Sequence, residues 1–140
     1  MPDPEPAGLE SDPRFPSGPW TGFFLDARMP GRHPMDLRLT FQAGVMAGDG
    51  CDAIGAFHIK GRYDVVTGRC HWHKRYPGQH DVFYQGYNEG KGIWGVWQLT
   101  EHGVKARGGF HIWPEGMPDP TGNRLAEEAD APADKELVEV

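Results

Sequence analysis

The chain has 140 residues and a net charge of −6, and its 20 glycines and 13 prolines divide it into short segments. No apolar run approaches the roughly 20 residues that a membrane-spanning helix needs, and no secretion signal is visible. Two cysteines are too few for a disulfide framework. These observations exclude a disulfide-rich scaffold and predict a cytoplasmic protein with no membrane partner.

Both ends of the chain lack apolar periodicity and are rich in proline or in acids. Residues 1–18 carry a net charge of −3 and residues 115–140 a net charge of −6, which leaves +3 for residues 19–114. Such segments bury too little apolar surface to offset the entropy lost on ordering. We therefore predict one folded domain over residues 19–114, a proline-rich disordered tail before it and an acidic disordered tail after it.

Apolar and polar side chains alternate through most of residues 19–114, which is the period of half-buried β-strands. The residues predicted to share the inner face are, in chain order, Trp20, Gly22 and Phe24; Met35, Leu37, Leu39 and Phe41; Phe57, Ile59 and Gly61; Cys70, Trp72, Lys74 and Tyr76; Val82, Tyr84 and Gly86; Ile93, Gly95, Trp97 and Leu99; Phe110 and Ile112. The glycine-rich residues 48–52 predict a bulged or sharply bent connection.

Seven or eight short strands with hairpin-length turns predict an all-β fold. The pattern suits an antiparallel up-and-down meander barrel of about eight strands, because closure removes exposed sheet edges. A two-sheet sandwich is the alternative, and the short sequential turns favour up-and-down order over Greek-key crossings. Eight strands leave an interior just wide enough for side chains or for one small ligand. The contents of this interior therefore decide what the barrel can do.

The middle of the chain resembles the avidin/streptavidin barrels. The motifs that carry the resemblance are Gly61-Arg62-Tyr63-Asp64, Trp72 with Tyr76 and His80, Gly86-Tyr87, Trp97-Gln98-Leu99-Thr100, and the opening Gly18-Pro19-Trp20 with Gly22. The resemblance implies an eight-stranded meander of calycin type with Trp72 and Trp97 on the interior wall. Biotin binding is not implied, because Asp81-Val82-Phe83-Tyr84 lacks the family's hydroxyl side chains and residues 109–113 lack its acidic partner.

The predicted inner face also carries a polar cluster. A buried lysine or aspartate is costly unless it is paired, so we expect Asp52 to pair with Lys74 and tyrosine hydroxyls to complete the hydrogen bonds. One interpretation is a ligand site in an aromatic-lined interior, and the other is a register-fixing ion pair in a filled interior. The candidate ligand-binding residues are Asp52, Trp72, Lys74, Tyr76, Tyr84 and Trp97. Because Lys74 has no evident second catalytic partner, we predict no catalytic residue.

Three histidines form a second constellation. His71 and His73 point the same way on one strand, and His58 on the preceding strand could lie across from them, which is a possible transition-metal geometry. The pair resembles the His-x-His of cupins, but no acid follows before Asp81. Neighbouring Lys74 and Arg75 oppose a bound cation. Surface histidines are the alternative, and no other cofactor is predicted.

Large apolar residues also fall on the predicted outer face: Phe23, Leu25, Phe83, Trp94 and Trp113. Exposed aromatic patches mark association, so we predict a homo-oligomer unless loops or tails cover them. Basic and aromatic residues alternate in Lys60-Gly61-Arg62-Tyr63 and His73-Lys74-Arg75-Tyr76, as in single-strand binders. The charge of only +3 on residues 19–114 nevertheless argues against a nucleic-acid partner.

The sequence thus favours a non-enzymatic barrel that binds a small molecule in its interior. Two alternatives stay open: a metal-dependent, cupin-like enzyme that uses the His-x-His site, and an oligomeric protein-interaction module with a filled interior.

Overall fold

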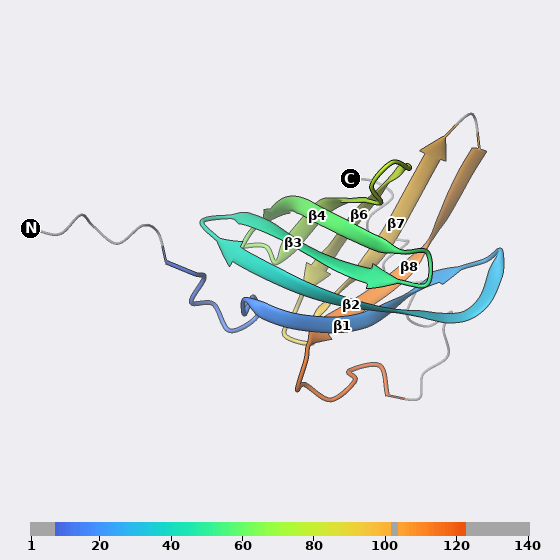
Figure 1. Cartoon of the computed structure of the whole chain (residues 1–140). Coiled ribbons are helices and arrows are strands. Elements are labelled where there is room, and N and C mark those ends of the chain that lie inside the picture. Colours follow the sequence, from blue (N-terminus) through green and yellow to red (C-terminus); the bar gives the residue numbers. More distant parts are fainter. Residues whose placement is uncertain (1–7, 102–103, 123–140) are drawn as a thin grey trace, which may run out of the picture.

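The computed structural model describes residues 8–101 and 104–122, in which all regular secondary structure is β-strand. The strands are β1 (Gly18–Asp26), β2 (Met29–Gln42), β3 (Val45–Asp52), β4 (Ala56–Tyr63), β5 (Arg69–Arg75), β6 (Asp81–Asn88), β7 (Ile93–Glu101) and β8 (Val104–Pro114). Each strand pairs antiparallel with the next, and β8 pairs with β1 to close a barrel (Figure 1). The predicted all-β meander barrel is confirmed.

Alternation along the strands decides which side chains fill the barrel. On β5, Trp72 and Lys74 are each 1% exposed, whereas the residues on either side of them are exposed. The prediction of a bent connection over residues 48–52 is wrong, because these residues complete a continuous β3 that pairs with β2 and β4. Glycine allows this close approach: a Cβ at Gly48 would lie 2.0 Å from the carbonyl oxygen of Arg38.

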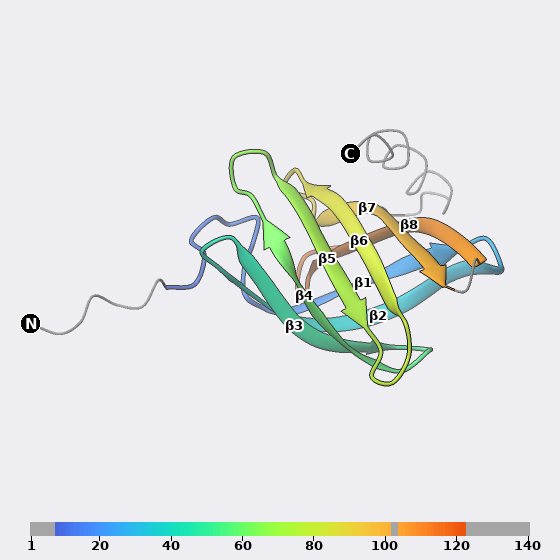
Figure 2. The ribbon, with the colours of Figure 1, turned by 90° about the horizontal axis from the view of Figure 1, so that it is seen from above.

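Residues 8–17 lie across one end of the barrel, which we call the sealed end (Figure 2). Phe15 is fully buried there, with its ring centroid 4.9 Å from that of Tyr63 and 5.4 Å from that of Phe41. The Tyr63 hydroxyl donates a hydrogen bond to the Glu10 carboxylate at 2.6 Å. A segment that composition assigns to a tail therefore supplies a core side chain.

A segment that follows β8 covers part of the outer surface of β1. Phe23, Leu25 and Trp113 point outward as predicted, but none is more than 8% exposed, because they pack together with Met117. Three of the five side chains that suggested an exposed association patch are therefore buried within the chain. Residues 115–122, which composition also assigns to a tail, provide this cover.

The described part of the chain extends beyond the predicted domain of residues 19–114 on both sides. Residues 1–7 and 123–140, which hold the ends of both predicted tails, lie outside the described residues. Over residues 8–101 and 104–122, no helix is long and apolar enough to span a membrane.

The ladder that closes the barrel ends before its strands do. β1 and β8 pair only as far as Phe24 and Phe110, whereas β1 continues with β2 to Asp26 and β8 with β7 to Val104. Beyond the last shared pair the two hairpins diverge, and Figure 1 shows β7 and β8 rising away from the β1–β2 turn. This open end, opposite the sealed end, has a cleft between the two hairpins.

Candidate functional site

The predicted ion pair between Asp52 and Lys74 is present inside the barrel. Lys74 Nζ lies 2.6 Å from Asp52 Oδ2, and the two side chains are 1% and 0% exposed. The Tyr76 hydroxyl donates to the same carboxylate oxygen at 2.5 Å, and Lys74 Nζ donates to the Tyr84 hydroxyl at 3.2 Å. These four residues form one hydrogen-bonded group, which we call the lysine cluster.

Aromatic rings enclose the ammonium group of the lysine cluster. The distances from Lys74 Nζ to the ring centroids are 4.4 Å for Phe57, 4.9 Å for Phe24, 5.2 Å for Tyr76 and 5.3 Å for Tyr84. A desolvated cation gains about 2 kcal/mol or more from such contacts. Aromatic cages of this kind bind quaternary ammonium ligands. Here the lysine of the chain itself occupies the cage.

Burial and charge act in opposite directions on the pKa values of the ion pair. Burial raises the pKa of Asp52, but the charge of Lys74 and hydrogen bonds from Lys74 and Tyr76 outweigh it, so the pKa lies below its ordinary value. Burial lowers the pKa of Lys74, and Asp52 restores it only in part. Burial and the hydrogen bond to Asp52 raise the pKa of Tyr76, so its phenol remains a donor.

Trp72 and Trp97 both point inward but have different surroundings. Trp72 stacks on Tyr84, with the ring centroids 5.3 Å apart, and its buried Nε1 has no hydrogen-bond partner among the described residues. Trp97 Nε1 donates to the carbonyl oxygen of Leu25 at 2.8 Å. This bond joins β7 to β1 just beyond the last pair of the closing ladder. Trp97 therefore helps to hold β7 against β1 at this end of the barrel.

Little free space remains beside the lysine cluster. A cavity of about 30 Å³, enough for about one water molecule, lies against Tyr76, Tyr84 and Trp97. The structure therefore brings together all six side chains predicted to bind a ligand: Asp52, Trp72, Lys74, Tyr76, Tyr84 and Trp97. Of these, only Tyr76, Tyr84 and Trp97 line the cavity. Around Lys74 the interior is filled by side chains.

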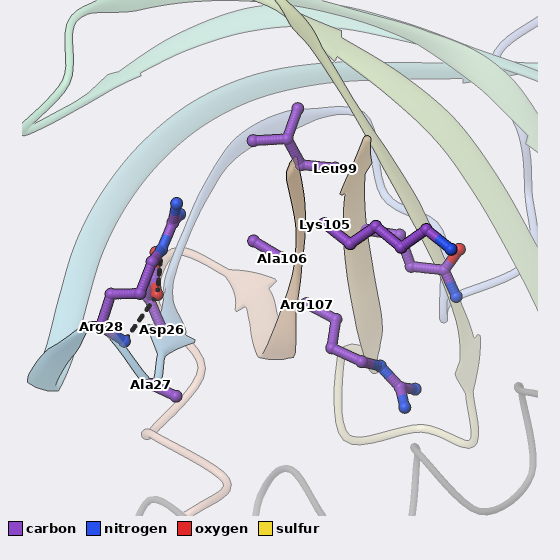
Figure 3. Close-up of a pocket in the computed structure, with 8 residues that line it drawn as sticks. Asp26, Ala27, Arg28, Leu99, Lys105, Ala106 and Arg107 are labelled. Atoms are coloured by element: carbon purple, nitrogen blue, oxygen red, sulfur yellow. Dashed lines mark hydrogen bonds and ion pairs between the residues drawn. The ribbon is translucent and has the colours of Figure 1, made fainter. Parts of the chain in front are cut away.

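The larger space is the cleft between the diverging hairpins, with a volume of about 500 Å³. The residues that line it are Asp26, Ala27, Arg28, Gln98, Leu99, Lys105, Ala106 and Arg107. The cleft and the small cavity share Asp26, Arg28 and Leu99. Figure 3 shows Leu99 and Ala106 projecting toward Arg28, while Lys105 and Arg107 extend to the other side of the β7–β8 hairpin. The cleft thus has an apolar wall and a polar wall.

An ion pair at the β1–β2 turn forms the polar wall. Arg28 donates from Nη2 to Asp26 Oδ2 at 2.7 Å and from Nε to Asp26 Oδ1 at 3.0 Å. The hydrogen bond from Arg28 lowers the pKa of Asp26 against the opposing effect of burial. The Asp26 side chain is 4% exposed and that of Arg28 is 55% exposed. The buried carboxylate therefore orients a guanidinium group that remains accessible from the cleft.

The three histidines predicted as metal ligands lie on the outer face of β4 and β5. The register places His71 opposite Arg62 and His73 opposite Lys60, while His58 lies opposite Arg75. Cationic side chains therefore alternate with the imidazoles. Among the described residues, no three His, Cys, Asp or Glu side chains converge in a way that could hold a metal ion.

Sequence reasoning missed the residues of the cleft. Asp26, Arg28, Leu99 and Ala106 were not predicted as site residues, and their local signal is only a short Asp-Ala-Arg sequence at a turn. The cleft exists because the ladder between the first and last strands stops at Phe24. Alternation within one strand carries no information about where two distant strands part.

No protein-family model, curated protein or solved structure matches this chain. The number and order of its strands are compatible with a calycin-type barrel. The resemblance to avidins rests on the sequence motifs alone, so the geometry of the cleft and of the lysine cluster is the basis for a functional proposal.

Proposed function

We propose that the protein binds a small organic anion with an apolar body in the cleft at the open end. The main support is the cleft itself, which has a volume of about 500 Å³ and sets apolar Leu99 and Ala106 opposite an oriented Arg28. Small-molecule sites are typically 300–1,000 Å³ in volume and combine mostly apolar walls with a few placed polar groups.

The charges around the cleft favour an anionic ligand. Arg28 balances the charge of Asp26, while Lys105 and Arg107 add positive charge on the other hairpin. Guanidinium groups present a planar fork of donors that suits carboxylate, sulfonate and phosphate groups. Positive charge near a cleft raises the local concentration of anionic ligands.

The lysine cluster supports this site from below. Tyr84 and Trp97 reach the small cavity that adjoins the cleft, while Lys74 stays enclosed beneath them. The filled interior would keep the ligand at the open end and give it a rigid floor. The described residues that line the cleft include no nucleophile beside a base, so we propose binding rather than catalysis.

Two dyes that share an aromatic body test the proposal. Anilinonaphthalene sulfonate carries a negative charge, and N-phenylnaphthylamine is neutral. The double variant Asp26→Asn with Arg28→Gln removes the guanidinium without leaving a lone buried carboxylate. In fluorescence titrations, we expect this double variant to bind the sulfonate about tenfold or more weakly, as for a lost charged hydrogen bond. Its affinity for the neutral dye should not change.

The chain offers a matched control in the pair of Arg75 and Asp81, whose Nε and Oδ1 atoms are 2.9 Å apart outside the cleft. Asp81→Asn with Arg75→Gln should change neither dye's affinity. Near-ultraviolet circular dichroism confirms folding, because the sulfonate also binds partly unfolded proteins. Equal weakening by the two double variants, or no preference for the charged dye, would contradict the proposal.

A further inference from the structure

The outer face of β4 and β5 is a separate surface with its own chemistry. The outward side chains that follow Ala56 on these two strands are all exposed, and each is basic or histidine: His58, Lys60, Arg62, Arg69, His71, His73 and Arg75. We call this surface the basic face. Figure 2 shows β4, β5 and β6 side by side on one side of the barrel, away from the β1–β2 turn.

Acidic groups lie at both ends of the basic face. Asp64 follows β4, and its backbone N–H donates to the carbonyl oxygen of Arg69. At the opposite end Asp49 on β3 lies opposite His58, and Asp81 on β6 pairs with Arg75. Between these ends the residues of β3 opposite Lys60 and Arg62 are apolar. No acid within the described ranges forms an ion pair with Lys60 or Arg62. This part of the face therefore carries uncompensated positive charge.

Strand β6 adds aromatic rings along the edge of the basic face. The Phe83 ring centroid lies 5.2 Å from that of His73 and 6.3 Å from that of His71. The Arg69 guanidinium lies 5.3 Å from the centroid of the Tyr87 ring. Phe83 and Tyr87 are half-buried, so part of each ring is open to solvent. The aromatic rings of β6 thus lie beside the cations and histidines of β5.

We propose that the basic face binds single-stranded nucleic acid, with phosphates on Lys60, Arg62 and Arg69 and bases stacked on Phe83 and the histidine rings. Single-strand binders combine a positively charged track with aromatic stacking platforms, and a sheet face can supply both. Outward side chains repeat about every 6.6–6.8 Å along a strand, which gives an extended polymer a regular series of contacts.

Averaged over residues 19–114, a net charge of only +3 argues against a nucleic-acid partner. In the structure, four exposed lysine and arginine side chains gather on the outer face of β4 and β5, two adjacent strands that carry no acid. An acidic membrane would also be attracted to these cations, but Phe83 and Tyr87 are half-buried in the sheet, so little of either ring is available to insert into a lipid interface. The ring positions therefore favour a polymer of bases over a charged surface.

Fluorescence anisotropy of the full chain with a labelled oligothymidine of about twelve nucleotides tests the inference. If the three phosphates on Lys60, Arg62 and Arg69 are neutralised, affinity should fall about twentyfold between about 50 and about 200 mM salt. Lys60→Gln with Arg62→Gln should lower the slope of log affinity against log salt by about 1.4. A duplex of the same length should bind more weakly than the single strand.

A second variant separates base stacking from simple attraction of a polyanion. Phe83→Leu keeps an apolar side chain but removes the stacking ring, so it should weaken oligothymidine about fivefold or more and leave heparin binding unchanged. Arg38→Gln with Lys91→Gln removes two exposed charges from other surfaces and should change the salt slope little. Circular dichroism confirms that each variant is folded.

Binding that is insensitive to salt, or an equal change of slope in the Arg38 and Lys91 variant, would overturn the inference. It would also be overturned if Phe83→Leu bound the oligonucleotide as well as the unchanged chain, or if phosphatidylserine vesicles bound while the oligonucleotide did not. The affinity of anilinonaphthalene sulfonate for the cleft serves as an independent readout in the same samples. Loss of oligonucleotide binding with that affinity unchanged supports a site on the basic face.

Discussion

The two ends of the barrel are closed in different ways. At the sealed end, an added segment places Phe15 over the rings of Phe41 and Tyr63. At the open end, the interior is filled by Lys74, a side chain of the wall itself, held between Asp52 and aromatic rings. The first solution covers the barrel from outside. The second fills it from within and leaves the space above free for a ligand.

The two closures also differ in what they contribute to stability. An apolar ring stabilises the fold because its surface is removed from water, and the gain in free energy depends mainly on the apolar area buried. A buried ion pair offsets its own desolvation only when both partners are present, and it specifies one arrangement. The comparison predicts that the sealed end is sensitive to lost volume and the open end to lost charge balance.

The largest effect should come from Phe15→Ala at the sealed end. Removing a fully buried phenylalanine typically destabilises a protein by about 3–5 kcal/mol, since both burial and packing are lost. Urea unfolding followed by tryptophan fluorescence measures the change. Leu9→Ala is the control: Leu9 is 60% exposed in the same segment, so its loss should cost less than about 0.5 kcal/mol. Similar costs for the two variants would show that Phe15 does not seal the barrel.

The next effect concerns the charge balance inside the barrel. Lys74→Met alone leaves Asp52 buried without its counter-charge and should destabilise the fold by about 3 kcal/mol. Adding Asp52→Asn should restore the wild-type free energy of unfolding or exceed it, because a well-packed apolar replacement of a buried pair is often neutral or stabilising. If the double variant were less stable than the single one, charge balance would not be what matters at this end.

The smallest effect is a difference in acid sensitivity. The pKa of Asp52 lies below its ordinary value in the folded chain, so its ionised form stabilises the fold above about pH 4, and this contribution is lost as pH falls through the folded pKa. The wild type should therefore lose more stability on acidification than the Asp52→Asn and Lys74→Met double variant. Urea unfolding at neutral and acidic pH measures this loss of free energy of unfolding in each protein. The contributions of the other carboxylates are the same in both proteins and cancel in the difference. Equal losses would contradict the assigned pKa direction.

Much of the barrel could be predicted because strand alternation is local. The inward positions of Trp72, Lys74 and Tyr76 follow from spacing along one strand, and the ion pair with Asp52 follows from the cost of an unpaired buried charge. Short turns between successive strands then determine which strands pair with each other. The fold and the lysine cluster were therefore accessible from sequence.

The remaining features depend on contacts that no local pattern encodes. Phe15 is a single apolar residue among prolines, so nothing in its segment indicates a core position. Trp113 was predicted to point outward and does, but its cover by Met117 comes from a segment without periodicity. The cleft depends on the point at which the first and last strands separate, which is a property of the closed barrel.

The pairing of β1 with β8 also has a consequence for the order of folding. Trp20 lies opposite Pro114, so the ladder that closes the barrel joins the beginning of the sheet to its end. During synthesis β1 therefore has one unpaired edge until the last strand has emerged. An open strand edge is a template for pairing with another chain. The time needed to make β8 thus sets the interval in which the nascent protein is most vulnerable to aggregation.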